Sequence, residues 1–264
     1  MSAKHAMEIS CRNLSWKPKE RSTPILNRVS LEFAPGSICG IIGPNGSGKS
    51  SLLRHIMGFL PVQEGEVLWG GRKVGKYSRK ELARLTAYVP QETRLDTDFT
   101  AFDVVMTGRN PYQDRWGRPG EDDIKKTRKA MAFAGCSHLS RQPFRQLSGG
   151  EAQKVIIARA IAQETPWILL DEPVSGLDVK SETEVLTRLK KLNETEGTSI
   201  LIVLHDLNAA AAYCDSIVMM KEGRVMFCGT ACDAMNPARL DELYEITFGE
   251  LSAGDGRKFF YPIA

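Results

Sequence analysis

The stretch SICGIIGPNGSGKSSLL, residues 37–53, limits the possible folds more strongly than any other part of the chain. A continuous apolar run leads into a glycine-rich loop, and a helical pattern follows from about Gly48 to Gly58. The loop matches GxxxxGK[ST], and the strand before it and the helix after it are the context that this motif requires. Glycines let backbone N–H groups surround phosphate oxygens, and the helix N-terminus adds partial positive charge. The sequence therefore predicts a phosphate-binding loop.

This loop predicts a magnesium nucleotide as its ligand. Lys49 would reach the β- and γ-phosphates, and the Ser50 hydroxyl would ligate Mg²⁺. A glycine-rich turn with an incidental lysine is the plain alternative, and a dinucleotide-binding turn does not fit because the GxGxxG spacing is absent. The predicted phosphate-binding residues are Gly43, Pro44, Asn45, Gly46, Ser47, Gly48, Lys49, Ser50 and Ser51.

Apolar runs of strand length alternate with helical patterns along the chain. The runs in TPWILLDEP and GTSILIVLHD flank the amphipathic pattern VKSETEVLTRLKKLNETE, and their continuous apolar character is typical of a parallel sheet covered on both faces by helices. Residues 7–66 hold β-type runs joined by short loops, which indicates an added antiparallel edge. We therefore expect an α/β fold in one domain, 1–264. Its parallel-sheet core and antiparallel β subdomain would comprise 1–92 and 160–264, with an α-helical subdomain inserted at 93–159.

Polar residues that end two of the apolar strands predict the hydrolytic chemistry. Asp171 would hold Mg²⁺, and Glu172 would accept a proton from an attacking water. His205 ends the next strand, where an imidazole can donate to the γ-phosphate. Acidic residues in a loop and a structural histidine are the plain alternatives. Ligands gather beyond the carboxyl ends of parallel strands, so we expect these residues near the phosphate-binding loop.

The segment LSGGEAQK opens a helix in an unusual way. A capping box explains Ser148 together with Glu151. It does not explain Gly149 and Gly150, because glycine costs roughly 1 kcal/mol relative to alanine inside a helix.

Joined in this order, these motifs resemble the nucleotide-binding subunit of ABC transporters, which are P-loop NTPases, over about residues 7–230. The resemblance implies that the chain hydrolyses ATP with Mg²⁺, that Gln91 in VPQE is a catalytic and magnesium-binding Q-loop residue, and that His205 is the switch histidine. It implies that residues 147–150 form the signature motif. The residues that it adds to the ATP-binding set are Trp16 as the adenine-stacking residue, Ser148, Gly149 and Gly150 of the signature, and Asp178 of the D-loop SGLD.

The chain offers two helix N-termini for phosphate, one after Gly48 and one at Ser148, but only one set of hydrolytic residues. The resemblance implies a homodimer in which two copies pack head to tail, so that the signature of one chain covers the ATP held by the other. It also implies integral-membrane permease subunits, contacted through the Gln91 loop and the helical subdomain, and, indirectly, a substrate-binding protein.

The segment DVVMTGRNPYQDRW resembles the subgroup that serves importers of iron chelates, haem and cobalamin. The matching residues are Val105, Gly108, Arg109, Pro111 and Tyr112. A helix end followed by a solvated turn is an alternative interpretation of this segment. Two other functions stay open: an ABC ATPase of another transporter, such as an exporter or an oxyanion or metal-ion importer, and a non-transport ABC ATPase acting on nucleic acid or ribosomes.

Composition bears on partners and location. A formal net charge of +3 is too balanced to indicate nucleic acid as a partner. We expect a protein at the cytoplasmic face of the cell membrane, because no apolar run approaches the length of a membrane span. The six cysteines are scattered, so reduced and mostly buried thiols are expected. KFFYPIA at the C-terminus predicts a closing strand.

Overall fold

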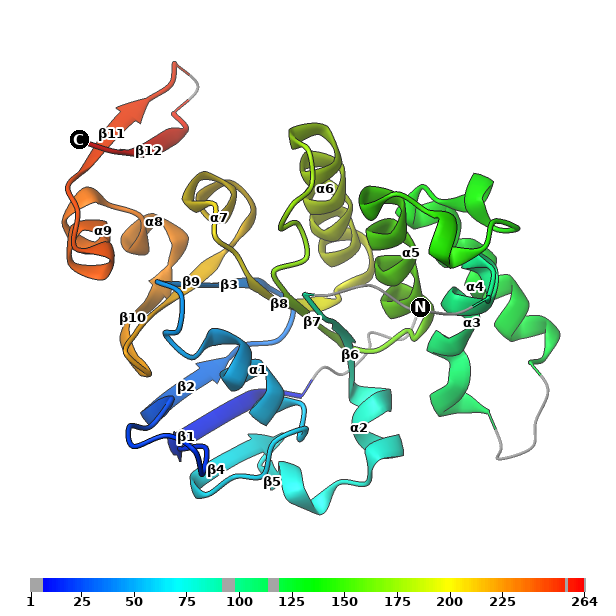
Figure 1. The fold of residues 1–264 in the computed structure, drawn as a ribbon, viewed down its shortest axis with the longest axis horizontal. Coiled ribbons are helices and arrows are strands. Elements are labelled where there is room, and N and C mark those ends of the chain that lie inside the picture. Colours follow the sequence, from blue (N-terminus) through cyan, green and yellow to red (C-terminus); the bar gives the residue numbers. More distant parts are fainter. Residues whose placement is uncertain (1–6, 92–97, 114–118, 255, 264) are drawn as a thin grey trace. The chain divides into compact units, whose positions relative to one another are not determined.

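The computed structural model describes residues 7–91, 98–113, 119–254 and 256–263, which form two compact units. The helical unit comprises residues 78–198, and the sheet unit comprises residues 7–77 and 199–263. Both units contain strands and helices, as the predicted α/β fold requires (Figure 1).

The sheet unit is built around strands that follow one another in the order β10-β9-β3-β8. Strand β3 pairs in parallel with both β8 and β9, whereas β10 pairs antiparallel with β9. Every residue of β3 and β8 is buried, which confirms the continuous apolar strands expected of a covered parallel sheet. Their bounds are β3 Ile38–Ile42, β8 Ser199–Val203, β9 Ser216–Lys221 and β10 Arg224–Thr230.

A second sheet in the same unit has the order β2-β1-β4-β5 and is antiparallel throughout. It confirms the antiparallel edge predicted for the N-terminal part of the chain. Trp69 at the end of β4 is fully buried, and its indole Nε1 donates to the carbonyl of Ile56 at 2.9 Å, which ties this sheet to α1. The bounds are β1 Ile9–Trp16, β2 Leu26–Phe33, β4 Glu64–Trp69, β5 Arg72–Lys73 and α1 Lys49–Ile56.

The C-terminal part of the sheet unit carries short helices and a hairpin. The closing strand predicted at KFFYPIA is confirmed as β12, which pairs antiparallel with β11 (Figure 1). The bounds are α7 Leu207–Tyr213, α8 Ala231–Ala234, α9 Pro237–Tyr244, β11 Phe248–Ser252 and β12 Lys258–Pro262.

The helical unit contains the parallel pair β6 and β7 and the helices expected between them in the chain. Helices α3, α4 and α5 pack against one another, which confirms the inserted helical subdomain (Figure 1). All five residues of β7 are buried. The bounds are α2 Arg79–Leu85, β6 Thr86–Val89, α3 Ala101–Met106, α4 Glu121–Ala134, α5 Gly149–Ala162, β7 Trp167–Asp171 and α6 Val179–Glu196.

Candidate active site

The phosphate-binding loop joins β3 to α1 in the sheet unit, and backbone atoms crowd two of its glycines. A Cβ on Gly43 would lie 2.0 Å from the carbonyl oxygen of Met220, which belongs to β9. Gly48 has a φ of 100°, and a Cβ there would lie 2.7 Å from the carbonyl oxygen of Ile25. Neither position accepts a side chain, because L-residues avoid this φ and the backbone atoms leave no space. The surrounding strands therefore fix the shape of the loop.

Two side chains inside this loop have the chemistry of an anion site. Lys49 is only 5% exposed, and its Nζ donates to the carbonyl oxygens of Gly43 at 2.8 Å and Pro44 at 2.9 Å. The buried Ser47 hydroxyl has no hydrogen-bond partner among the described residues. A buried polar atom normally finds a partner, so an unpaired hydroxyl beside an ammonium group at a helix N-terminus fits a phosphate ligand.

His205 lies at the same edge of this sheet as the loop. It follows β8, which pairs in parallel with β3 through Ile41 and Val203, and it is exposed. The phosphate-binding loop follows β3 in the same direction. The sheet unit thus places His205 and the loop beyond the ends of two neighbouring parallel strands, where ligands of such sheets collect.

Trp16 ends β1 and packs beside α1. Its ring meets the His55 ring edge-on, with centroids 5.2 Å apart and an interplanar angle of 67°. His55 is fully buried, and its Nδ1 lies 2.7 Å from the carbonyl oxygen of Ser51. Burial lowers the pKa of His55, which favours the neutral ring. Trp16 itself is half-buried, and its stacking on adenine remains a prediction.

The helical unit brings together three other predicted residues, at the ends of β6 and β7. Asp171 is 2% exposed, and the Tyr88 hydroxyl donates to its Oδ2 at 3.2 Å. Gln91 Nε2 donates to Glu172 Oε2 at 2.6 Å. Glu172 has a φ of 50°, a left-handed backbone that costs about 1–2 kcal/mol for a residue with a Cβ. Such strain at a carboxylate that follows a buried strand is typical of functional sites.

Tyr88 was not among the residues singled out from the sequence. The sequence feature that could have indicated it is its position on the strand before Gln91. In the register of β6 and β7, Tyr88 pairs with Leu169, which lies two residues before Asp171. Side chains on alternate residues of a strand share a face, so a tyrosine at this position can reach the end of the neighbouring strand.

The signature turn begins α5 with the capping box that the sequence predicted. The backbone N and the hydroxyl of Ser148 donate to Glu151 Oε2 at 2.9 Å and 2.7 Å, and the Glu151 N–H donates to Ser148 Oγ at 3.4 Å. The Ser148 hydrogen bonds hold the pKa of the Glu151 carboxyl below its ordinary value. Apart from Gly149 itself, its two chain neighbours and the adjoining backbone of its own helix, no heavy atom of the described residues lies within 4 Å of a Cβ built on Gly149. The described part of the chain therefore gives no packing reason for glycine there.

Asp178 has a structural contact in the helical unit. It is the N-cap of α6 and accepts hydrogen bonds from the backbone N and the hydroxyl of Ser181, at 3.0 Å and 2.7 Å. A Cβ on Gly150 would lie 3.4 Å from the same Ser181 hydroxyl. The signature turn and the start of α6 are therefore neighbours, and the contact of Asp178 with ATP remains a prediction.

The GRNPY segment packs tightly within the helical unit. Arg109 is 3% exposed, and its guanidinium pairs with Asp123 at 3.0 Å and with Glu164 at 3.2 Å. The guanidinium also lies 4.3 Å from the centre of the Tyr112 ring. A Cβ on Gly108 would lie 2.3 Å from the carbonyl oxygen of Arg159. These contacts give the glycine, the arginine and the tyrosine of the motif packing roles.

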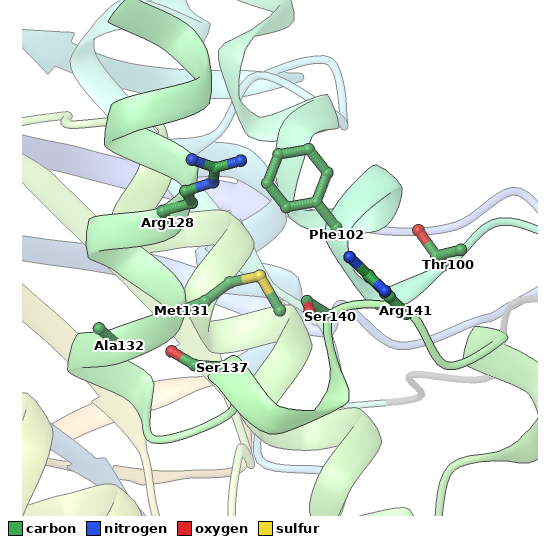
Figure 2. Close-up of a pocket in the computed structure, with 8 residues that line it drawn as sticks. All are labelled: Thr100, Phe102, Arg128, Met131, Ala132, Ser137, Ser140 and Arg141. Atoms are coloured by element: carbon green, nitrogen blue, oxygen red, sulfur yellow. The ribbon is translucent and has the colours of Figure 1, made fainter.

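A hollow of about 670 Å³ opens on the helical unit, between the start of α3 and the C-terminal half of α4. In Figure 2 the Phe102 ring and the Arg128 guanidinium face each other near Met131. Its lining residues are Thr100, Phe102, Arg128, Met131, Ala132, Ser137, Ser140 and Arg141. No helix within the described ranges is long and apolar enough to span a membrane.

The predicted site residues thus form two groups, one in each unit. The loop, its lysine and His205 belong to the sheet unit, whereas Gln91, Asp171, Glu172, Asp178 and the signature belong to the helical unit. A GxxxxGKS loop at the end of a buried parallel strand, with a strand-terminal buried carboxylate in the same chain, defines a P-loop nucleotide-binding protein.

Comparison with known proteins narrows this class. The family model described as ABC transporter matches residues 26–175, so the chain belongs to the ABC transporter family. The hemin import ATP-binding protein HmuV of Bordetella pertussis (strain Tohama I) is 35% identical over 251 residues, which cover 91% of this chain and 93% of that protein.

Two solved structures show the same fold. A putative metal-chelate type ABC transporter in an inward-facing conformation has a TM-score of 0.85 and 24% identity, covering 98% of each chain. An ATP-binding cassette in a dimeric post-hydrolysis state, bound to ADP and Pi, has a TM-score of 0.75 and 31% identity, covering 84% of this chain and 98% of that chain. The fold predicted from the sequence, an α/β core with antiparallel and helical additions, is confirmed.

Proposed function

We propose that this protein hydrolyses ATP to power the import of a metal chelate, as a peripheral subunit at the cytoplasmic face of a membrane permease. The observation that carries the ATPase assignment is the strained Glu172, whose carboxylate follows a buried strand and contacts the Gln91 amide at 2.6 Å. The phosphate-binding loop, with its buried lysine and unpaired Ser47 hydroxyl, supports a triphosphate as the ligand.

In this proposal each residue has a separate task. The Lys49 ammonium group donates hydrogen bonds to phosphate oxygens in place of the Gly43 and Pro44 carbonyls. The Ser47 hydroxyl also donates a hydrogen bond to the phosphates. Glu172 accepts a proton from the attacking water, and His205 donates to the γ-phosphate. The predicted role of Trp16, stacking on adenine, completes the nucleotide site.

The donor set also fits Mg²⁺. A hydroxyl, an amide and a carboxylate supply hard oxygen ligands, which this ion prefers. Asp171 is a buried carboxylate that accepts a hydrogen bond from the Tyr88 hydroxyl, and a cation stabilises a buried carboxylate. Ser50, Gln91 and Asp171 would hold the ion. When bound, Mg²⁺ neutralises charge on the phosphates.

We further propose that two copies pack head to tail. The open space at Gly149, in a turn that presents a helix N-terminus, supports a phosphate from outside the chain as the ligand of the signature. The dimeric cassette bound to ADP and Pi supports a dimer of this fold.

The cargo is proposed from two sources. The GRNPY segment resembles the chelate-importer subgroup, and the 35% identical HmuV is a hemin import protein. An iron-siderophore, haem or cobalamin complex is therefore the proposed class, delivered by a substrate-binding protein. Cells that carry Lys49→Ala should lose uptake of their metal chelate. Uptake at the wild-type rate in those cells would contradict the transport role.

The hollow on the helical unit is the proposed docking site for the permease. Met131 and Phe102 give its lining apolar surface, and Arg128 and Arg141 give it positive charge. This lining favours a short cytoplasmic segment of the permease that combines apolar side chains with a carboxylate. Phe102 comes shortly after the predicted Gln91 loop in the chain, which would link permease contact to the ATPase site.

The experiment that tests the ATPase assignment is the turnover of Glu172→Gln. This variant should bind ATP as the wild type does, because the phosphate-binding loop is unchanged, and its turnover should fall by roughly 10² or more. Glu184→Gln is the control, since Glu184 pairs with Lys154 at 2.6 Å in the same unit but has no proposed chemical role. Turnover of Glu172→Gln near the wild-type value would refute the assignment.

A further inference from the structure

The Asn208 side chain pairs with the backbone of the C-terminal hairpin. The Phe260 N–H donates to Asn208 Oδ1 at 2.8 Å, and Asn208 Nδ2 donates to the Phe260 carbonyl oxygen at 3.2 Å. These two hydrogen bonds match those that a neighbouring strand would make with β12. The two residues are 52 positions apart, so this is a long-range tether rather than a local turn.

The hairpin is anchored to the rest of the sheet unit at its inner face. Phe260 is 4% exposed, and Phe248 on β11 is also buried. The Phe248 N–H donates to Asp241 Oδ1 at 2.6 Å, which joins β11 to α9. A two-stranded hairpin is marginally stable in water by itself. The contacts of Phe260 and Phe248 with the sheet unit hold the hairpin in place, so that β12 can in turn hold a side chain that pairs with it.

Helix α7 needs such a support. It has seven residues and fully buries only Ala210, and an isolated helix of this length is unstable in water. Asp206 caps it by accepting hydrogen bonds from the Asn208 and Ala209 N–H groups at 2.7 Å and 3.0 Å. Alanines fill most of the remaining helix and offer little apolar surface to pack. The position of its first turn consequently depends on polar contacts such as the Asn208 pair.

The first turn of α7 directly follows His205. A shift of Asn208 would also move Asp206, the neighbour of the histidine, because the Asn208 N–H donates to Asp206 Oδ1 at 2.7 Å. The C-terminal part of the chain also lies beside the phosphate-binding loop, since Tyr244 of α9 lines a hollow together with Pro44 and Asn45. Helix α9 and strand β12 thus lie beside the phosphate-binding loop and α7, respectively, at the edge where ligands of this sheet collect.

We propose that Asn208 is a positioning residue for His205, which it holds in place by pairing α7 with the Phe260 backbone of the C-terminal hairpin. The proposal rests on the proposed function of His205 at the γ-phosphate. Asn208 does not touch ATP. It sets the place from which the imidazole donates.

The test compares Asn208→Ala and Asn208→Asp with the control Asn236→Ala. The aspartate keeps the shape of Asn208 and an acceptor for the Phe260 N–H, but it loses the Nδ2 donor and places a carboxylate oxygen against the Phe260 carbonyl, which breaks the pairing. Asn236 is matched to Asn208 because its side chain also makes two backbone hydrogen bonds in the sheet unit, at 2.9 Å and 3.1 Å. It caps α9.

Both Asn208 variants should lower kcat for ATP hydrolysis by about 10-fold, since small misplacement of a positioned group costs up to roughly 100-fold. The KM for ATP and the number of ATP sites per chain should stay unchanged, whereas a partly unfolded preparation would lose sites. Hydrogen exchange should rise in residues 205–213 and stay constant in residues 38–56. Asn236→Ala should keep kcat within about twofold of the wild type.

A kcat of both Asn208 variants equal to that of Asn236→Ala would overturn the proposal, as would a loss of ATP sites that accounts for the whole decrease. Glu172→Gln is measured in parallel. If Glu172→Gln is slow and the Asn208 variants are normal, only the role of Asn208 fails. If Glu172→Gln keeps wild-type turnover, the proposed function fails and the role of Asn208 with it.

Discussion

Alanine at Gly149 should stabilise the fold and impair the enzyme at the same time. The backbone of Gly149 is not in the left-handed region, and an added Cβ would meet no described heavy atom within 4 Å outside its chain neighbours and its own helix backbone. Under these conditions Gly→Ala stabilises a protein by about 0.4–1 kcal/mol, chiefly by restricting the unfolded chain. For a chain of this size, that corresponds to a rise in Tm of roughly 1–4 °C.

The catalytic effect should have the opposite sign. If a phosphate held by another copy approaches this turn, the added methyl group stands in its path and displaces the transition state. A loss of about 10- to 100-fold in kcat is expected for such displacement. The expected pair of results is a higher Tm and a lower kcat in one variant.

Thermal unfolding and steady-state ATPase assays measure these two effects on the same preparations. Gly75→Ala is the matched control, because Gly75 also has an open Cβ position and an ordinary φ but belongs to the sheet unit and not to the signature. Both variants should gain stability, and only Gly149→Ala should lose turnover. Unchanged kcat in Gly149→Ala would refute the idea that the glycine leaves room for a ligand.

Two further predictions concern the helical unit. Arg109→Met should lower the free energy of unfolding by about 2–4 kcal/mol and Tm by roughly 5–15 °C, because the Asp123 carboxylate loses its buried partner. Glu164 keeps its pair with Lys126 in this variant. A shift in Tm below about 2 °C would contradict the packing role of the arginine. Glu151 has a lowered pKa in the fold, so its capping contribution is present above its ordinary pKa and is lost as pH falls through the lowered value. Glu151→Gln should therefore flatten the fall in Tm below about pH 5, and an unchanged slope there would show that the capping box does not contribute to it.

The parts of the fold that depend on local sequence could be predicted. The buried strands β3, β7 and β8 appear in the sequence as continuous apolar runs. The phosphate-binding loop and the capping box at Ser148 are each formed by residues close together in the sequence. Local chemistry decides such features, because neighbours in sequence supply both partners of each interaction.

Contacts between distant segments could not be predicted in the same way. The pairing of Asn208 with Phe260 and the hydrogen bond from Tyr88 to Asp171 join residues that are 52 and 83 positions apart. No sequence pattern around either residue identifies its partner, since a tyrosine or asparagine side chain can form hydrogen bonds with many backbone or carboxylate groups. The resemblance of GRNPY to a transporter subgroup likewise gave no sign that Arg109 would be buried between Asp123 and Glu164.

The signature turn combines a feature that the sequence predicts with one that a single chain does not explain. The capping box accounts for Ser148 and Glu151 within one chain, whereas the open space beside Gly149 has no use within the described residues. In the proposed dimer, a ligand held by the second copy supplies that use.

The central claim is that ATP lies between two copies of this chain, and mixing two inactive variants tests it most directly. Lys49→Ala disables the phosphate-binding loop, and Ser148→Arg blocks the signature turn, so each variant alone should be inactive. A mixed dimer combines the intact loop of one chain with the intact signature of the other, and it should recover up to one competent site. Differently tagged chains establish that mixed dimers form. ATPase activity in the mixture is the predicted result, and no recovered activity in demonstrated mixed dimers would contradict the shared site.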